Sequence, residues 1–333
     1  MRKKVFAVIQ YLIFLGLGIF LTWWQFSKMT PAQYTHFMGS LRNANYLVII
    51  PIVIMALLSH ISRAMRWKIM MEPMGYKPGT SNTFYAIMCG YFANTFIPRA
   101  GEILRCTLLG KYEKIPVNKL IGTILVERIF DLFCYGIFIV LTILLQFSIV
   151  KDFVENKVLQ ISSKNAHIPW IKIISVILLV GALIYLLVRW IFRKYAHHRH
   201  IIRIRGIHMG LKEGIMSILR LKRRGAFLFH TLFIWAMYVL EIYVGFNALS
   251  ATSGMGMGAA FSVLSLATLA MIVAPGGIGA FPVAVQQVLL IYSVDNLSFG
   301  WLMWGTNTGI ILIVGVLSFG LLIYNNKNNY ESR

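Results

Sequence analysis

Three charged residues, Glu127, Arg128 and Asp131, lie within an apolar stretch that runs from Leu120 to Phe147. Ionisable groups are expensive inside a membrane unless they are paired or hydrated, and they often mark functional sites. Glu127 and Asp131 share one helix face because they are four residues apart. Two carboxylates on one face need cations nearby or a shared proton. The pattern predicts a substrate or proton site or, alternatively, a structural ion-pair cluster close to the cytoplasmic interface.

The preceding segment supplies cations and a break in the chain, through Asn94, Pro98, Arg99, Gly101, Glu102 and Arg105. Pro98 lacks a backbone donor and Gly101 relaxes the chain, so we expect a broken helix here. The helix that follows would begin with free amides, which bind anions. Arg99 and Arg105 would add charge-assisted contacts to a phosphate.

Arg63 and Arg66 end the second apolar stretch and point to one side, because they are three residues apart. On its own this pair, with Trp67 beside it, is more typical of an anchor at the membrane interface. Adjacent elements usually pack together, and unpaired charges are costly at depth. We therefore expect the pair at the cytoplasmic edge of one partly buried cluster formed by Arg99, Glu102, Arg105, Glu127, Arg128 and Asp131.

A second break is expected at Pro275-Gly276-Gly277-Ile278-Gly279. A dinucleotide-binding loop would need a preceding strand in a βαβ unit, which this apolar context does not offer. The run instead predicts a close-packed, unwound turn within the membrane. Gln286, Gln287 and Asn307 could line a cavity beside this turn, or could only form hydrogen bonds between helices.

Other reactive residues give weaker signals. His230 and Glu241 lie eleven residues apart in one apolar stretch and could belong to a proton path, or be an interfacial histidine and a paired glutamate. Cys89, Cys106 and Cys134 occur singly, and the histidines at 197, 198 and 200 lie in a basic loop. No metal site, cofactor site or catalytic triad is predicted.

The composition defines the class of protein that holds these residues. Of 333 residues, 58% are hydrophobic and only 13% are charged, and the mean hydropathy is +0.71. These values exclude a soluble enzyme, a disordered chain and a DNA-binding domain. The net charge of +21 follows from 32 Lys and Arg against 11 Asp and Glu. In so apolar a chain, this positive charge indicates that Lys and Arg lie on cytoplasmic loops and contact anionic lipids. No nucleic-acid partner is expected.

The apolar runs predict an all-α polytopic membrane protein, a single integral membrane domain over residues 1–333. We expect six full spans, at about 5–24, 46–59, 120–147, 170–190, 227–249 and 299–324. The segment 81–110 is predicted to enter and return, because a full crossing would put five cations outside. With a second broken element at 259–292, the chain has the features of an inverted repeat. Both termini and the basic loop 193–224 are expected to be cytoplasmic.

Four segments, in the same order, resemble those of the lysylphosphatidylglycerol synthase/flippase transmembrane family. They are Arg63-Ala-Met-Arg-Trp67, Asn94-Thr-Phe-Ile-Pro-Arg-Ala-Gly-Glu-Ile-Leu-Arg105, Val126-Glu-Arg-Ile-Phe-Asp131 and Ala274-Pro-Gly-Gly-Ile-Gly279. The resemblance implies a protein that moves a charged lipid between leaflets or accompanies a glycosyl-lipid pathway. Pro282 stands where the family usually has a glutamate. The sequence ends at Arg333 without the soluble aminoacyl-transferase domain of the full-length synthase, so synthase activity is not expected.

The leading hypothesis is a lipid flippase of the bacterial inner membrane that moves a phosphate-bearing lipid, with membrane lipids as its partners. One alternative is a membrane-embedded transferase with Glu127 or Asp131 as base. Another is a non-catalytic partner of a glycosyltransferase or lipid-modifying enzyme. The residues expected to bind substrate are Arg63, Arg66, Asn94, Arg99, Glu102, Arg105, Glu127, Arg128, Asp131, Gly276, Gly277, Gly279 and Gln286.

Overall fold

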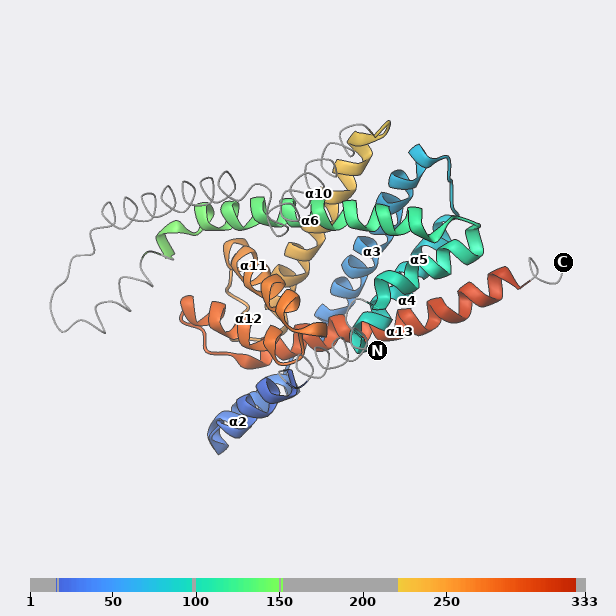
Figure 1. Ribbon diagram of the computed structural model, residues 1–333. Helices are drawn as coiled ribbons and strands as arrows, with labels where there is room; N and C mark the ends of the chain where they lie inside the picture. Colours follow the sequence, from blue (N-terminus) through green and yellow to red (C-terminus); the bar gives the residue numbers. More distant parts are fainter. Residues whose placement is uncertain (1–15, 17, 98–99, 150, 152–220, 328–333) are drawn as a thin grey trace, which may run out of the picture. The chain divides into compact units, whose positions relative to one another are not determined.

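The computed structural model describes residues 16, 18–97, 100–149, 151 and 221–327 (Figure 1). Within these ranges every regular element is a helix. The chain divides into two units, one of residues 1–146 and 220–333 and the other of residues 147–219. Everything described below belongs to the first unit. The predicted span 170–190 and the predicted basic loop, apart from its last residues, lie outside the described residues.

Within the described residues, four helical segments are long and apolar enough to cross a membrane: Tyr46–Met74, Val117–Leu145, Arg224–Ala248 and Leu297–Asn326. They match four of the six predicted spans. Of the predicted span 5–24, only the part from residue 16 onward is described, and its helix continues to residue 27. The structure therefore confirms an all-α, multi-pass membrane protein, while the sidedness of its loops stays a prediction.

Helix α3 (Ile49–Met71) continues well beyond the predicted end of the second span. The short 3-10 helices η1 (Tyr46–Val48) and η2 (Glu72–Met74) flank it. The sequence interpretation ended the span at Ser59 because arginines follow. That interpretation was wrong, because Arg63 and Arg66 are buried inside the helix bundle. Helix α3 packs along α10 (Arg224–Gly245), which ends in η3 (Phe246–Ala248).

The first broken element is a helical hairpin of α4 (Thr80–Phe96) and α5 (Ala100–Glu113). Ile97 has extended backbone angles and ends α4, so the predicted break is confirmed. The sequence suggested that Gly101 relaxes the chain. The structure differs, because Gly101 lies in the first turn of α5. Its role is steric: a Cβ atom at Gly101 would overlap the backbone carbonyl of Gly90. The two glycines thus let α4 and α5 pack closely.

We expect Gly101→Ala to lower the stability of the hairpin. The added methyl group has no room between the helix backbones, and overpacking of this kind costs about 1–3 kcal/mol. Gly136→Ala is the matched control, because a Cβ atom there meets nothing within 4 Å and alanine favours a helix interior. Thermal unfolding in detergent should show a lower midpoint for Gly101→Ala only. Equal midpoints for both variants would contradict the close packing of α4 on α5.

The second broken element consists of α11 (Met257–Val273), η4 (Pro275–Gly277) and α12 (Ala280–Ile291). Gly276, Gly277 and Gly279 have φ angles of 66°, 68° and 69°. Residues with a Cβ atom rarely adopt this region, which explains three glycines in four positions. The predicted unwound turn is confirmed. It contacts the end of α4, so the two broken elements meet. The inverted repeat itself stays a prediction.

The remaining described helices close the bundle. Helix α6 (Val117–Leu145) contacts α3, α5 and α11, and α13 (Leu297–Asn326) contacts α4 and α12. Helix α2 (Pro31–Arg42) begins with a capping box between Thr30 and Gln33. One apolar core lies between α10, α11, α12 and α13, and a second surrounds Trp67 between α3, α4, α5 and α6. The second core adjoins the charged residues described next.

Candidate functional site

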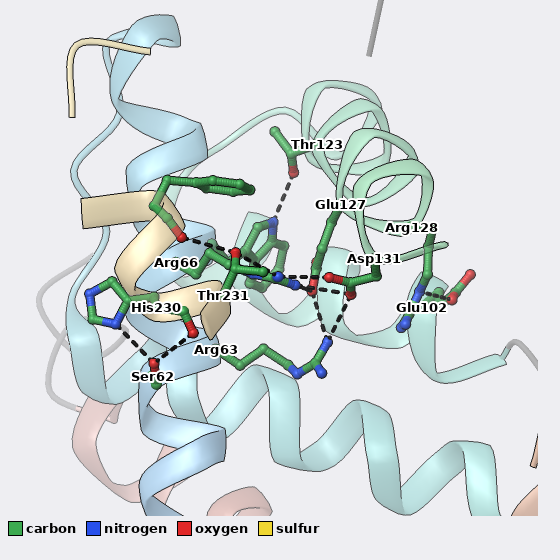
Figure 2. Close-up of polar contacts among 12 residues, drawn as sticks. Ser62, Arg63, Arg66, Glu102, Thr123, Glu127, Arg128, Asp131, His230 and Thr231 are labelled. Carbon is green, nitrogen blue, oxygen red and sulfur yellow. Dashed lines mark hydrogen bonds and ion pairs between the residues drawn. The ribbon is translucent and has the colours of Figure 1, made fainter. Parts of the chain in front are cut away.

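Three arginines and two carboxylates from three helices meet at one place, which we call the charge cluster. Figure 2 shows four of the five residues, Arg63, Arg66, Glu127 and Asp131. Arg63 and Arg66 come from α3, Arg105 comes from α5, and Glu127 and Asp131 come from α6. The two carboxylates face the same way because they are one helical turn apart. Long helices bring together groups that are more than sixty residues apart in the chain.

Glu127 is the centre of the charge cluster. Its Oε1 accepts hydrogen bonds from Arg66 Nη2 at 3.0 Å and Arg63 Nη1 at 3.2 Å, and its Oε2 accepts one from Arg105 Nη2 at 3.0 Å. Its side chain is only 1% exposed. A buried carboxylate is costly unless cations compensate it, and here three guanidinium groups do so.

Asp131 forms the outer part of the charge cluster. Arg66 binds it with both terminal nitrogens, Nη1 to Oδ1 at 2.6 Å and Nη2 to Oδ2 at 3.0 Å. Arg63 Nη1 donates to Oδ2 at 3.3 Å. The Asp131 side chain is 19% exposed, so this edge of the charge cluster is the more accessible one. Two-point contacts between arginine and carboxylate fix orientation as well as charge.

The charge cluster has more positive than negative charge and more donors than acceptors. Three arginines face two carboxylates, which leaves a formal charge of one positive unit. Buried Nε of Arg63, and buried Nε and Nη1 of Arg105, have no hydrogen-bond partner among the described residues. Buried polar groups are normally satisfied. The free N–H groups and the extra charge together suit the cluster to an anion.

Arg63 and Arg66 therefore have a different place from the one predicted. The sequence put them at the cytoplasmic edge of the cluster, or made them interfacial anchors. In the structure they lie at its centre, and Arg66 is 1% exposed. The cost of burying them explains the position, because each carboxylate compensates both arginines.

Glu102 and Arg128 form a separate pair beside the charge cluster (Figure 2). Arg128 Nε donates to Glu102 Oε1 at 2.9 Å, and the side chains are 40% and 33% exposed. Both residues were expected in one cluster with Glu127 and Asp131, but the described ion pair of Arg128 is with Glu102. Residue 128 follows Glu127 by about 100° around the helix, so its side chain points toward the start of α5.

The other predicted site residues serve the two breaks. Asn94 Oδ1 accepts a hydrogen bond from the Gly101 backbone at 2.8 Å and caps α5. The Ala100 amide also donates a hydrogen bond, to the Ile97 carbonyl at 3.2 Å. Two of the first amides of α5 thus have protein acceptors, and the predicted anion site there stays a prediction. Arg99 lies outside the described residues.

The glycine turn is held by side chains from two other helices. Trp304 Nε1 donates to the Gly276 carbonyl at 2.7 Å, and Gln25 Nε2 donates to the Gly279 carbonyl at 2.8 Å. These bonds satisfy carbonyls that the unwound backbone leaves free. Gln286 lies apart, where its Nε2 donates to Asp295 Oδ1 at 2.8 Å. It lines a cavity, but the residues that line this cavity include none of the glycine turn, beside which the sequence analysis expected it.

Helix α10 contributes two groups that the sequence analysis missed. Tyr238 hydroxyl accepts from Arg63 Nη2 at 2.9 Å, and Thr231 Oγ1 accepts from Arg66 Nη1 at 3.3 Å. Residues 231 and 238 are seven apart, which is close to two helical turns. Polar residues at that spacing in an otherwise apolar span were the signal that could have revealed them. Trp67, which the sequence analysis considered an interfacial anchor, stacks on Arg105: the guanidinium carbon Cζ lies 4.9 Å from the centre of the Trp67 ring.

Glu241 is buried on α10 without the compensation that Glu127 has. Its Oε1 has no hydrogen-bond partner among the described residues, and Glu241 belongs to none of their ion pairs. His230, the other predicted member of a proton path, instead contacts Ser62, with 2.9 Å between Nδ1 and Oγ.

We expect Glu241→Gln to be at least as stable as the wild type. A neutral amide avoids the cost of an unpaired buried carboxylate. The thermal unfolding midpoint in detergent should be unchanged or higher. A clear decrease would show that Glu241 has a stabilising partner that the present contacts do not include.

No group of three or more metal-ligating side chains occurs in the described part of the chain. What the described helices assemble is an ion-pair site, with donors suited to an anion and aromatic side chains around them.

Comparisons with known proteins agree with this picture. Residues 8–323 match the model of the lysylphosphatidylglycerol synthase TM region. The UPF0104 membrane protein MJ1595 of Methanocaldococcus jannaschii is 34% identical over 104 residues, which cover 28% of this chain and 31% of that protein. The alignment thus spans about a third of the relative's length. No solved structure matches the chain. Because the family model covers nearly all of the sequence, the chain belongs to the lysylphosphatidylglycerol synthase transmembrane-region family.

Proposed function

We propose that this protein moves a phosphate-bearing lipid between the leaflets of a bacterial inner membrane, with both termini in the cytoplasm. The observation that carries the proposal is the charge cluster: a buried site with one excess positive charge and guanidinium N–H groups that have no hydrogen-bond partner among the described residues. A lipid phosphate supplies a negative charge and several acceptor oxygens, which are what these groups lack.

The residues have distinct roles in this proposal. Arg105 contacts the phosphate, because two of its nitrogens are free. Glu127 holds Arg105 through its Oε2 and the two α3 arginines through its Oε1. Asp131, at the more exposed edge, meets an amine where the headgroup carries one. The meeting of the two broken elements fits transporters, whose substrate sites are formed by interrupted helices.

Membership of the family supports a lipid-related role. The alternative of a transferase with Glu127 as base is less well supported by the contacts. Three arginine hydrogen bonds stabilise the charged carboxylate and leave it little tendency to accept a proton. The other alternative, a non-catalytic partner of a lipid-modifying enzyme or glycosyltransferase, requires that the chain be inactive alone.

The test uses the purified chain in liposomes that contain fluorescent phosphatidylglycerol. A membrane-impermeant quencher measures how fast the labelled lipid reaches the outer leaflet, and mass spectrometry of the extracted lipids detects any new product. We expect faster exchange than in protein-free liposomes, with no covalent change. Exchange at the protein-free rate contradicts the proposal. A new lipid product would instead support the transferase, and activity only with an added enzyme would support the partner role.

A further inference from the structure

A second group of cations lines a cavity of about 210 Å³ where α3 ends and α10 begins. We call it the cationic pocket. Among the described residues, the charged ones that line it are Lys68 on α3, Glu72 on η2, Lys77 in the following turn and Arg223 at the start of α10. These three cations and one carboxylate give two excess positive charges, which is twice the excess of the charge cluster.

The cations of the pocket are only partly compensated. Arg223 Nη1 pairs with Glu72 Oε1 at 3.1 Å, and Lys68 Nζ donates to the neutral Thr80 hydroxyl at 2.6 Å. Lys77 has no hydrogen bond or ion pair with any described residue. Arg223 is also the N-cap of α10 and makes no side-chain cap bond there. The positive end of the α10 dipole therefore adds to the field of these side chains.

Apart from His230, the remaining described residues that line the cationic pocket are apolar. Met65 and Ile69 stand one helical turn apart on α3, and Pro78 precedes α4. A purely aqueous anion needs no such wall. A lipid headgroup does, because its phosphate lies beside the first carbons of its own chains. Basic pockets between membrane helices are known to hold anionic lipid headgroups.

The cationic pocket and the charge cluster both involve residues of α3 and α10. His230 lines the pocket, and its Nδ1 lies 2.9 Å from Ser62 Oγ. Ser62 precedes Arg63 in the chain, and Thr231, which follows His230, accepts from Arg66. Neighbouring residues of the same two helices thus belong to both sites, and Figure 2 shows His230 with Ser62, and Thr231 with Arg66.

We propose that the cationic pocket binds the phosphate of an anionic lipid in the leaflet that it faces. Binding there does not depend on transport, whereas use of the pocket as the entry point for the transported lipid rests on the proposed function. The lipid would approach along Met65 and Ile69 and place its phosphate among Lys68, Lys77 and Arg223.

The experiment measures lipid binding by native mass spectrometry of the full chain in a non-ionic detergent. Phosphatidylglycerol is titrated against zwitterionic phosphatidylcholine, and we expect preferential binding of the former. The variant Lys77→Gln with Arg223→Gln should weaken binding of phosphatidylglycerol at least tenfold. The control, Lys28→Gln with Arg42→Gln, removes the same charge outside the pocket and should leave that binding unchanged.

A third variant raises the net positive charge of the pocket instead of lowering it. Glu72→Gln removes its one carboxylate and frees Arg223, so phosphatidylglycerol should bind more tightly than to the wild type. This gain cannot arise from misfolding. Equal binding by the wild type, the double variant and Glu72→Gln would overturn the proposal.

Soluble glycerol phosphate distinguishes a lipid from a free phosphate compound. We expect millimolar concentrations to leave bound phosphatidylglycerol in place, because the soluble ligand makes no contact with the apolar wall. Displacement at equal concentration would overturn the assignment to a lipid. The transport assay on the same double variant then distinguishes lipid binding in the pocket from use of the pocket as the entry point for the transported lipid. Lost binding with normal transport would exclude the pocket as the entry point and leave the proposed function intact.

Discussion

Replacing Glu127 by glutamine is expected to cause the largest loss of stability of any single substitution in the charge cluster. The amide cannot compensate three buried guanidinium groups, and Asp131 alone would face a formal charge of three positive units. Removing one partner of a buried ion pair costs about 3–5 kcal/mol. Thermal unfolding in detergent should show a clearly lower midpoint.

Glu102→Gln is the matched control for this prediction. It is the same chemical change in a glutamate that pairs with one arginine, but in a pair that is 33–40% exposed. Its effect should be much smaller. A comparable loss in both variants would show that burial of the charge cluster does not determine its energetics.

A double substitution separates charge balance from other effects of the glutamine. Glu127→Gln with Arg105→Gln leaves Arg63 and Arg66 facing Asp131, with one excess positive charge as in the wild type. We therefore expect the double variant to recover part of the stability that Glu127→Gln loses. A double variant whose loss equals the sum of the two single losses would contradict coupling between these residues.

Arg105→Gln should abolish most lipid movement and leave the protein folded. The substitution leaves two arginines against two carboxylates, so the remaining charge cluster is balanced. It also removes the two buried nitrogens of Arg105 that have no hydrogen-bond partner in the described part of the chain. A hydrogen bond to a charged group contributes about 1.5–3 kcal/mol. The rate of leaflet exchange in liposomes should therefore fall at least tenfold.

Two further variants make the measurement specific. Arg105→Lys keeps the charge but loses the planar donor pair, so an intermediate rate is expected. Arg42→Gln removes an arginine at the end of α2, away from the charge cluster, and should exchange lipid at the wild-type rate. Wild-type exchange by Arg105→Gln would mean that the cluster is structural, the alternative that the sequence left open.

The sequence by itself was sufficient for the helical class, for both breaks and for the positions of the described spans, except the end of the second one. Apolar runs of membrane length leave no other fold for the backbone, since its polar groups must be satisfied internally. Breaks follow from local chemistry: Pro98 cannot continue α4, and the three glycines of η4 and its flank accept positive φ angles. The four-residue spacing likewise placed Glu127 and Asp131 on one face.

Only the tertiary structure decided which charges meet and what they leave free. Local spacing says nothing about the partner that a helix sixty residues away supplies. The sequence therefore placed Arg66 beyond the end of a span, whereas it is the most buried cation of the charge cluster. The same holds for Tyr238 of α10, whose contact with Arg63 depends on how α3 and α10 pack. The free nitrogens of Arg105 appear only once every neighbouring acceptor has been placed, because hydrogen-bond satisfaction is a property of the assembled bundle rather than of any one segment.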